Sequence, residues 1–194
     1  MAQQLIFVHG GEAFPTHGMF LDWLRTIAVF DPLRQDRRQK RWHRQLEAVL
    51  PGWSILRPQM PNDTNAQYVE WELYFEKVVP YMEQGCVLVG HSLGGTFLLK
   101  YLTKHVLPVQ PKALHLVAPS FGVPGTSFEV DEDVSVIPTR IPTTIHHSHD
   151  DTVVPYSESV EGILRMPGAQ LISYETKGHF IDETFPELVS LLCK

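Results

Sequence analysis

One serine in this sequence stands in a setting that can make it a nucleophile. Residues 90–95 read Gly-His-Ser-Leu-Gly-Gly, and they join an apolar run to a segment with helical spacing. Ser92 is therefore expected on a sharp strand-to-helix turn, where Gly90 and Gly94 lack the side chains that would collide as the helix packs back on its strand. The backbone N–H of Leu93, at the positive end of that helix, would face a developing oxyanion.

A nucleophilic serine needs a base and an acid, because its hydroxyl is almost fully protonated at neutral pH. After a turn of this kind the acid comes next in the chain and the histidine follows it. His179 is the expected base, since it lies beside Gly178 in the loop between the last apolar run and the last helical segment. Asp151 is the preferred acid because it directly precedes the step into the next segment, and the adjacent Asp150 is the alternative.

A second oxyanion donor is expected from the loop after the first apolar run, where residues 9–12 read His-Gly-Gly-Glu. Small residues there allow a backbone N–H to approach the reacting carbonyl group from the side opposite Leu93. Gly11 is the first candidate and Glu12 the second. The alternative is a turn that needs glycine for its conformation alone.

A cluster of histidines beside the two aspartates also suggests a metal site. His147 and His149 could share one face of a strand, with His146 and the carboxylates nearby. No helix bearing a glutamate and two histidines accompanies them, and the serine motif already explains an acid at this position. No metal and no cofactor is therefore expected.

The elements that must position these residues alternate along the chain. Short apolar runs at 5–8, 54–56, 86–89, 113–117, 143–147 and 170–174 are typical of buried parallel strands, and helical spacing occurs at 68–79, 93–102, 160–164 and 185–192. This alternation predicts an α/β fold in which a mostly parallel sheet of about six strands has helices on both faces. A single domain over residues 1–194 is expected, with Gly122 to Pro142 as a long surface connection. Only that stretch and Gly18 to Trp53 remain to cover Ser92, so a shallow cleft without a large lid is expected.

Composition and charge narrow the class of protein. The 194 residues, 43% of them hydrophobic, suit one well-filled core, and a net charge of -6 argues against a general nucleic-acid binder. The absence of a long apolar run and of a charged leader predicts a cytoplasmic protein without a membrane segment, and Cys86 and Cys193 are not expected to form a disulfide. From Arg34 to Arg44, six basic residues face one acid. This stretch is either an anion-attracting surface near the site or a solvated helix face.

The sequence resembles the compact serine hydrolases of the alpha/beta-hydrolase superfamily, of the retinoblastoma-binding protein nine type. The resemblance rests on residues 90–95, on 150–155, on Gly-His-Phe at 178–180 before a terminal helix, and on 58–61 followed by Trp71. It implies a Ser92, Asp151, His179 triad. The segment from Gly18 to Trp53 is longer and more basic than in the smallest members.

The predicted function is an esterase-like serine hydrolase that cleaves a small-molecule acyl substrate through an acyl-enzyme. A thioesterase, an amidase or an acyltransferase would use the same triad. A catalytically silent hydrolase-fold protein that binds a ligand or partner is the alternative from another class. Aromatic residues could line an acyl pocket or belong to the core: Phe14, Phe20, Trp23, Trp42 and Trp53. The sequence predicts neither the acyl chain length nor the oligomeric state.

Overall fold

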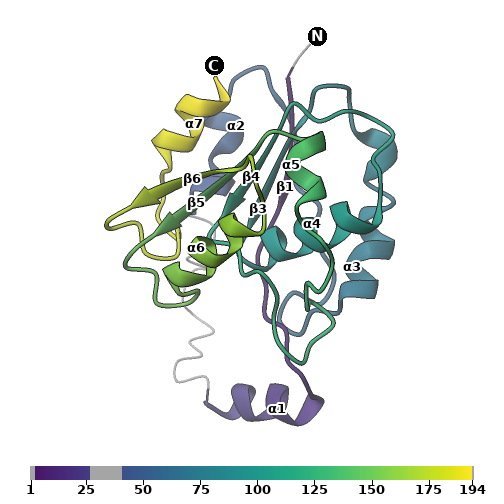
Figure 1. The fold of residues 1–194 in the computed structure, drawn as a ribbon, viewed down its shortest axis with the longest axis vertical. Coiled ribbons are helices and arrows are strands. Elements are labelled where there is room, and N and C mark those ends of the chain that lie inside the picture. Colours follow the sequence, from purple (N-terminus) through teal and green to yellow (C-terminus); the bar gives the residue numbers. More distant parts are fainter. Residues whose placement is uncertain (1–2, 27–40, 194) are drawn as a thin grey trace.

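The protein is built on one six-stranded parallel sheet (Figure 1). The computed structural model describes residues 3–26 and 41–193. The strand order is β2-β1-β3-β4-β5-β6, and every neighbouring pair is parallel. The strands are β1 (Gln4–Val8), β2 (Ser54–Leu56), β3 (Val87–His91), β4 (Ala113–Val117), β5 (Thr143–Ser148) and β6 (Gln170–Tyr174). The predicted α/β fold with a parallel sheet of about six strands is confirmed.

The inner strands are largely buried because both of their faces are covered, and most of their residues are apolar except on β5, which reads Thr-Thr-Ile-His-His-Ser. Side chains alternate along β1, where Ile6 and Val8 join one hydrophobic cluster and Leu5 and Phe7 join the other. The outer strands β2 and β6 are partly exposed. A strand buried on both faces reads as a continuous apolar run, which is why the predicted strands match the observed ones to within two residues.

Helices cover both faces of the sheet (Figure 1). The larger cluster contains residues of α3 (Tyr68–Phe75), α4 (Leu93–Lys104), α5 (Val136–Arg140) and α6 (Tyr156–Leu164). The smaller cluster contains residues of α2 (Leu46–Val49), α7 (Pro186–Leu192) and the short 3-10 helix Trp42–Arg44. By contrast, α1 (His17–Thr26) buries none of its residues and lies apart from the sheet.

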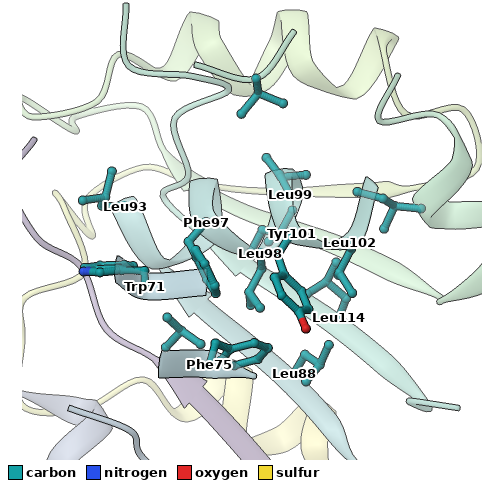
Figure 2. Close-up of a cluster of buried hydrophobic side chains, with 14 of the residues drawn as sticks. Trp71, Phe75, Leu88, Leu93, Phe97, Leu98, Leu99, Tyr101, Leu102 and Leu114 are labelled. Atoms are coloured by element: carbon teal, nitrogen blue, oxygen red, sulfur yellow. The ribbon is translucent and has the colours of Figure 1, made fainter. Parts of the chain in front are cut away.

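An aromatic cluster fixes α4 against α3 (Figure 2). The rings of Trp71 and Phe97 lie 5.7 Å apart between centroids, and those of Phe75 and Tyr101 lie 5.0 Å apart. Fully burying one such side chain contributes roughly 1.5–3 kcal/mol. The helix that begins directly after Ser92 is therefore firmly anchored.

Two expectations about irregular segments are wrong. Gly122 to Pro142 is not a surface connection: it contains α5, Phe128 and Ile137 are fully buried, and the Phe128 ring lies 5.3 Å from that of Trp71. Its apolar residues are unevenly spaced among prolines and glycines, so they show no periodicity although they fill the core. The helical segment expected over 68–79 ends at Phe75 and is followed by a 3-10 helix, Val79–Tyr81, because a proline at position 80 disfavours a longer α-helix.

The described ranges, 3–26 and 41–193, hold no helix with both the length and the apolar character needed to cross a membrane. Both cysteines are unpaired: Cys86 is buried and Cys193 is exposed.

Candidate active site

Ser92 occupies a strained turn between β3 and α4. It is the single residue that separates the two elements, with φ 54° and ψ -126°. A positive φ at a residue other than glycine is uncommon and costs free energy, so the surrounding structure must hold it. The Ser92 N–H donates a 2.8 Å hydrogen bond to the carbonyl oxygen of Val117 at the end of β4. The serine therefore stands at the carboxyl edge of the sheet, on the kind of turn that the sequence predicts.

The glycines on either side of Ser92 are required by close backbone approach. A Cβ at Gly94 would clash with the carbonyl oxygen of Val8 and lie 2.5 Å from that of His9. A Cβ at Gly90 would lie 2.7 Å from the carbonyl oxygen of Gly94. Real Cβ contacts are not this short, so only glycine at both positions lets α4 pack directly against β1 and β3.

His179 and Asp151 are joined by a short hydrogen bond. The Nδ1–H of His179 donates to Oδ2 of Asp151 at 2.8 Å, and Oδ1 accepts the N–H groups of Val153 and Val154 at 2.8 and 3.0 Å. Burial alone would raise the pKa of the Asp151 carboxyl. Hydrogen bonds from His147, His179 and the two amides nevertheless hold that pKa well below its usual range. Asp151 is therefore ionised at neutral pH, as a carboxylate that orients an imidazole must be.

The contacts of Asp150 differ from those of Asp151. Its Oδ1 accepts hydrogen bonds from the Ser148 hydroxyl at 2.6 Å and from the Gly178 N–H at 2.8 Å. Gly178 has φ 50°, a conformation that favours glycine. Asp150 thus links the loop after β5 to the loop after β6. The structure brings Asp151, and not Asp150, to the imidazole of His179.

His91 contacts His179, and the sequence analysis did not predict this contact. The Nε2–H of His91 donates to the backbone carbonyl oxygen of His179 at 2.9 Å, and the two rings lie 5.1 Å apart. Burial lowers the pKa of His91 well below its ordinary value, so its imidazole is neutral. The sequence offered no signal beyond the position of His91 beside Ser92.

The loop after β1 runs alongside the Ser92 side chain. A Cβ built on Gly10 would lie 3.0 Å from Ser92 Cβ and 3.5 Å from its Oγ. The Glu12 N–H already donates to the carbonyl oxygen of Asp63 at 2.8 Å. Within residues 3–26 and 41–193, the Gly11 N–H has no such acceptor. This makes Gly11 better placed than Glu12 to donate to an oxyanion.

His9 fixes the peptide group that carries the Gly11 N–H. Its Nδ1–H donates to the Gly10 carbonyl oxygen at 2.7 Å, and its Nε2 accepts the Met60 N–H at 2.9 Å. In a planar trans peptide the Gly10 carbonyl and the Gly11 N–H point in opposite directions, so fixing the first fixes the second. The Leu93 N–H, at the first position of α4, lacks an acceptor within its own helix. Sequence reasoning did not assign this part to His9.

Ser92, His179, Leu93 and Gly11 all line one cavity of about 1030 Å³. No hydrogen bond among the described residues joins Ser92 Oγ to the His179 ring, and the two side chains share the wall of this cavity. Its volume is at the upper end of small-molecule sites, about 300–1,000 Å³. The described part of the chain places no large lid over it.

The five aromatic residues considered for an acyl pocket divide between the cavity and the core. Trp23 lines the cavity, and the rings of Phe14 and Phe20 lie 5.4 and 6.1 Å from its ring. Trp42 is buried in the core and donates its indole N–H to a backbone carbonyl, while Trp53 packs partly buried against the same cluster. Of these five residues, Trp23 alone lines the cavity, with Phe14 and Phe20 packed against its ring.

The basic stretch lies only partly within the described residues. Positions 34–40 fall outside them, whereas Arg41 and Arg44 line the cavity. Between these two, His43 is buried against the ring of Phe7 at 4.6 Å. Burial and the neighbouring arginines lower the pKa of His43 to about 3.

The histidines suspected of binding a metal separate in space. His146 and His147 project to opposite faces of the sheet, where His146 bonds to His115 at 3.0 Å and His147 bonds to Ser159 at 2.6 Å. His149 packs in the loop after β5 and is exposed. Over residues 3–26 and 41–193, no three His, Cys, Asp or Glu side chains gather as a metal site.

A parallel sheet with a serine on a strained strand-to-helix turn, and a paired histidine and aspartate on the same edge, defines the α/β-hydrolase class. The chain belongs to the serine hydrolase family, whose model matches residues 32–188.

Solved structures share the fold. The ydeN gene product from B. subtilis is 20% identical, with a TM-score of 0.73 over 98% of this chain and 97% of that one. An esterase from Exiguobacterium antarcticum (EaEST) is 17% identical, with a TM-score of 0.62 over 100% and 92%. Est1E from Butyrivibrio proteoclasticus is 16% identical, with a TM-score of 0.60 over 98% and 85%. At these identities the similarity is one of fold.

Proposed function

We propose that this serine hydrolase is an esterase that cleaves a small-molecule acyl ester with Ser92, His179 and Asp151. The observation that carries the proposal is the 2.8 Å hydrogen bond from His179 Nδ1 to Asp151 Oδ2, beside the cavity that also contains Ser92. The strained backbone of Ser92 supports it, because such strain is typical of nucleophiles on this fold.

The mechanism follows from the hydrogen-bond pattern. Asp151 accepts the Nδ1 proton of His179, which leaves Nε2 free to take the Ser92 proton as Oγ attacks the ester carbonyl carbon. The Leu93 and Gly11 N–H groups stabilise the oxyanion. The imidazolium then protonates the leaving alcohol, and an acyl-serine remains. Water, deprotonated by His179, attacks this acyl-enzyme and releases the acid.

A solved structure of the same fold favours an ester over the other acyl substrates, and the cavity offers a place for its apolar part. EaEST, which shares the fold, is named as an esterase. The aromatic cluster of Trp23, Phe14 and Phe20 at the cavity offers an apolar surface for an acyl or alcohol group. Thioesters, amides and transfer to an alcohol use the same catalytic groups, so a panel of acyl esters, thioesters and amides of graded chain length decides among them. We expect esters to turn over fastest.

A fluorophosphonate probe tests the nucleophile directly. We expect the folded protein to be labelled at Ser92 and Ser92→Ala to abolish labelling. Ser120→Ala is the matched control, because Ser120 lines the same cavity but donates to Glu158 at 2.8 Å; it should label at the native rate. We expect His179→Ala to lower kcat for a short-chain nitrophenyl ester by about 10³-fold or more. Absence of Ser92 labelling, or equal activity in the His179 variant, would refute the assignment in favour of a hydrolase-fold binding protein.

A further inference from the structure

A second histidine contacts the carboxylate of Asp151. His147 lies on β5, four residues before Asp151, and its side chain is fully buried. Its Nε2 lies 3.4 Å from Asp151 Oδ2 and 2.9 Å from the carbonyl oxygen of Val154. Its Nδ1 lies 2.6 Å from the hydroxyl of Ser159 on α6, which is also fully buried. This histidine therefore contacts the acid of the site without being among the residues that line the cavity.

The partners of His147 determine where its proton lies. A backbone carbonyl and a carboxylate both only accept hydrogen bonds, so Nε2 of His147 carries a hydrogen, which it donates to the Val154 carbonyl oxygen with Oδ2 of Asp151 3.4 Å away. With the hydrogen on Nε2, Nδ1 accepts the hydroxyl hydrogen of Ser159. The result is a directed chain from Ser159 through His147 to Asp151. It ends on Oδ2, the same oxygen that accepts the Nδ1–H of His179.

We propose that His147, held by Ser159, is a positioning residue that fixes the plane of the Asp151 carboxylate and takes up part of its negative charge. The inference rests on the proposed esterase function. With Oδ1 held by two backbone amides and Oδ2 in contact with two imidazoles, the carboxylate is held in the orientation that faces His179. Because donors that share one acceptor divide its charge, His147 also moderates how strongly Asp151 stabilises the His179 imidazolium.

Other charged and titratable groups around this pair are the same in every variant described below. They come from β3, from α6 and from the loops after β5 and β6: His91, Tyr156, Glu158, Asp150, Lys177 and Asp182. Lys177 is paired with Glu187 at 2.8 Å. A change in the pH profile on replacing His147 therefore reports on the bond to Asp151.

His146 provides a matched control on the same strand. It is the preceding residue, it is fully buried, and its ring makes two side-chain hydrogen bonds, to His115 and Tyr174 at 3.0 Å each. It faces the opposite side of the sheet from His147. Replacing His146 removes as many buried hydrogen bonds of the side chain as replacing His147, but it leaves the contacts of Asp151 unchanged.

The experiment compares His147→Leu, His147→Gln, Ser159→Ala and His146→Leu in the full-length protein, by nitrophenyl ester kinetics and fluorophosphonate labelling rates. We expect His147→Leu to lower kcat about tenfold with KM within about twofold, since a carboxylate that is no longer held in place positions the His179 imidazole less well. The midpoint of the acidic limb of the kcat/KM profile should rise by about half a pH unit. His147→Gln, which keeps an N–H near the former Nε2, should stay within about threefold of native kcat.

Three results would overturn the inference: native kcat in His147→Leu, the same loss in His146→Leu, or no recovery in His147→Gln. If His147→Leu does not fold, Ser159→Ala decides, because it frees the His147 ring with only a small change in volume. We expect it to lower kcat severalfold, and native kcat and pH profile in this variant would overturn the proposal. Failure of the native protein to label at Ser92 would instead refute the esterase assignment itself.

Discussion

Replacing Gly10 with alanine should damage catalysis while preserving the fold. The added methyl would lie 3.0 Å from Ser92 Cβ and 3.2 Å from the carbonyl oxygen of His91. Carbon atoms normally approach to about 3.5–4.0 Å, so the loop and the serine must separate by about half an ångström. Gly10 does not have a positive φ, so alanine meets no backbone strain there. Because a 1 Å misplacement of reacting groups costs about 10²-fold, we expect about a tenfold loss of kcat/KM, or about 1.4 kcal/mol.

The assay is nitrophenyl ester hydrolysis alongside the melting temperature. Gly18→Ala on α1 is the control, because a Cβ there would meet only the Thr16 hydroxyl at 3.7 Å, an ordinary contact. We expect native kinetics from Gly18→Ala and a melting temperature within a few degrees of native for both variants. Native kcat/KM in Gly10→Ala would show that the loop after β1 does not border the reacting atoms, and the oxyanion role of Gly11 would fall with it.

Two further predictions concern charge. Asp151→Asn should lower kcat by about 10³-fold, because an amide cannot stabilise the imidazolium. Asp150→Asn should lower kcat only severalfold, because it weakens a contact between two loops. Equal losses of kcat in the two variants, measured in parallel, would refute the distinction. Burial and nearby Lys112 lower the pKa of His115 to about 4 from an ordinary value of 6.5, so the unfolded chain binds this proton more readily than the folded one. The stability that His115 contributes is therefore complete above pH 6.5 and is lost as the pH falls from 6.5 to 4. Because of this residue, the free energy of unfolding measured with urea should be about 2 kcal/mol lower at pH 5 than at pH 7. His115→Gln should remove this part of the pH dependence. An unchanged pH dependence in the variant would contradict the assignment.

The sheet was predictable because its strands are covered on both faces. Strands covered on both faces are mostly apolar, and the residues beyond their ends, such as Gly10 after β1 and Gly52 before β2, interrupt the pattern clearly. The turn at Ser92 was equally predictable, because the steric requirement for Gly90 and Gly94 shows in the residues directly around the serine.

Contacts between distant segments were not predictable from the sequence. The core position of Phe128 depends on α3, more than fifty residues earlier in the chain, and its neighbours show no regular spacing. His147 was visible only as one of three clustered histidines. Its contact with Ser159 depends on how α6 packs against β5, which no local pattern encodes. The choice between Gly11 and Glu12 likewise depended on Asp63, a residue of another loop.

The order of the strands divides the proposed catalytic groups between the middle and the edge of the sheet. Ser92 and the loop with Gly11 follow β3 and β1, which have neighbours on both sides, whereas His179 follows β6, which is paired along one side only and is partly exposed. Edge elements open locally at a lower free energy than the centre of a sheet. A partial opening of β6 would move the proposed general base away while the proposed nucleophile stays in an intact core. We therefore expect the protein to lose activity under conditions milder than those that unfold it.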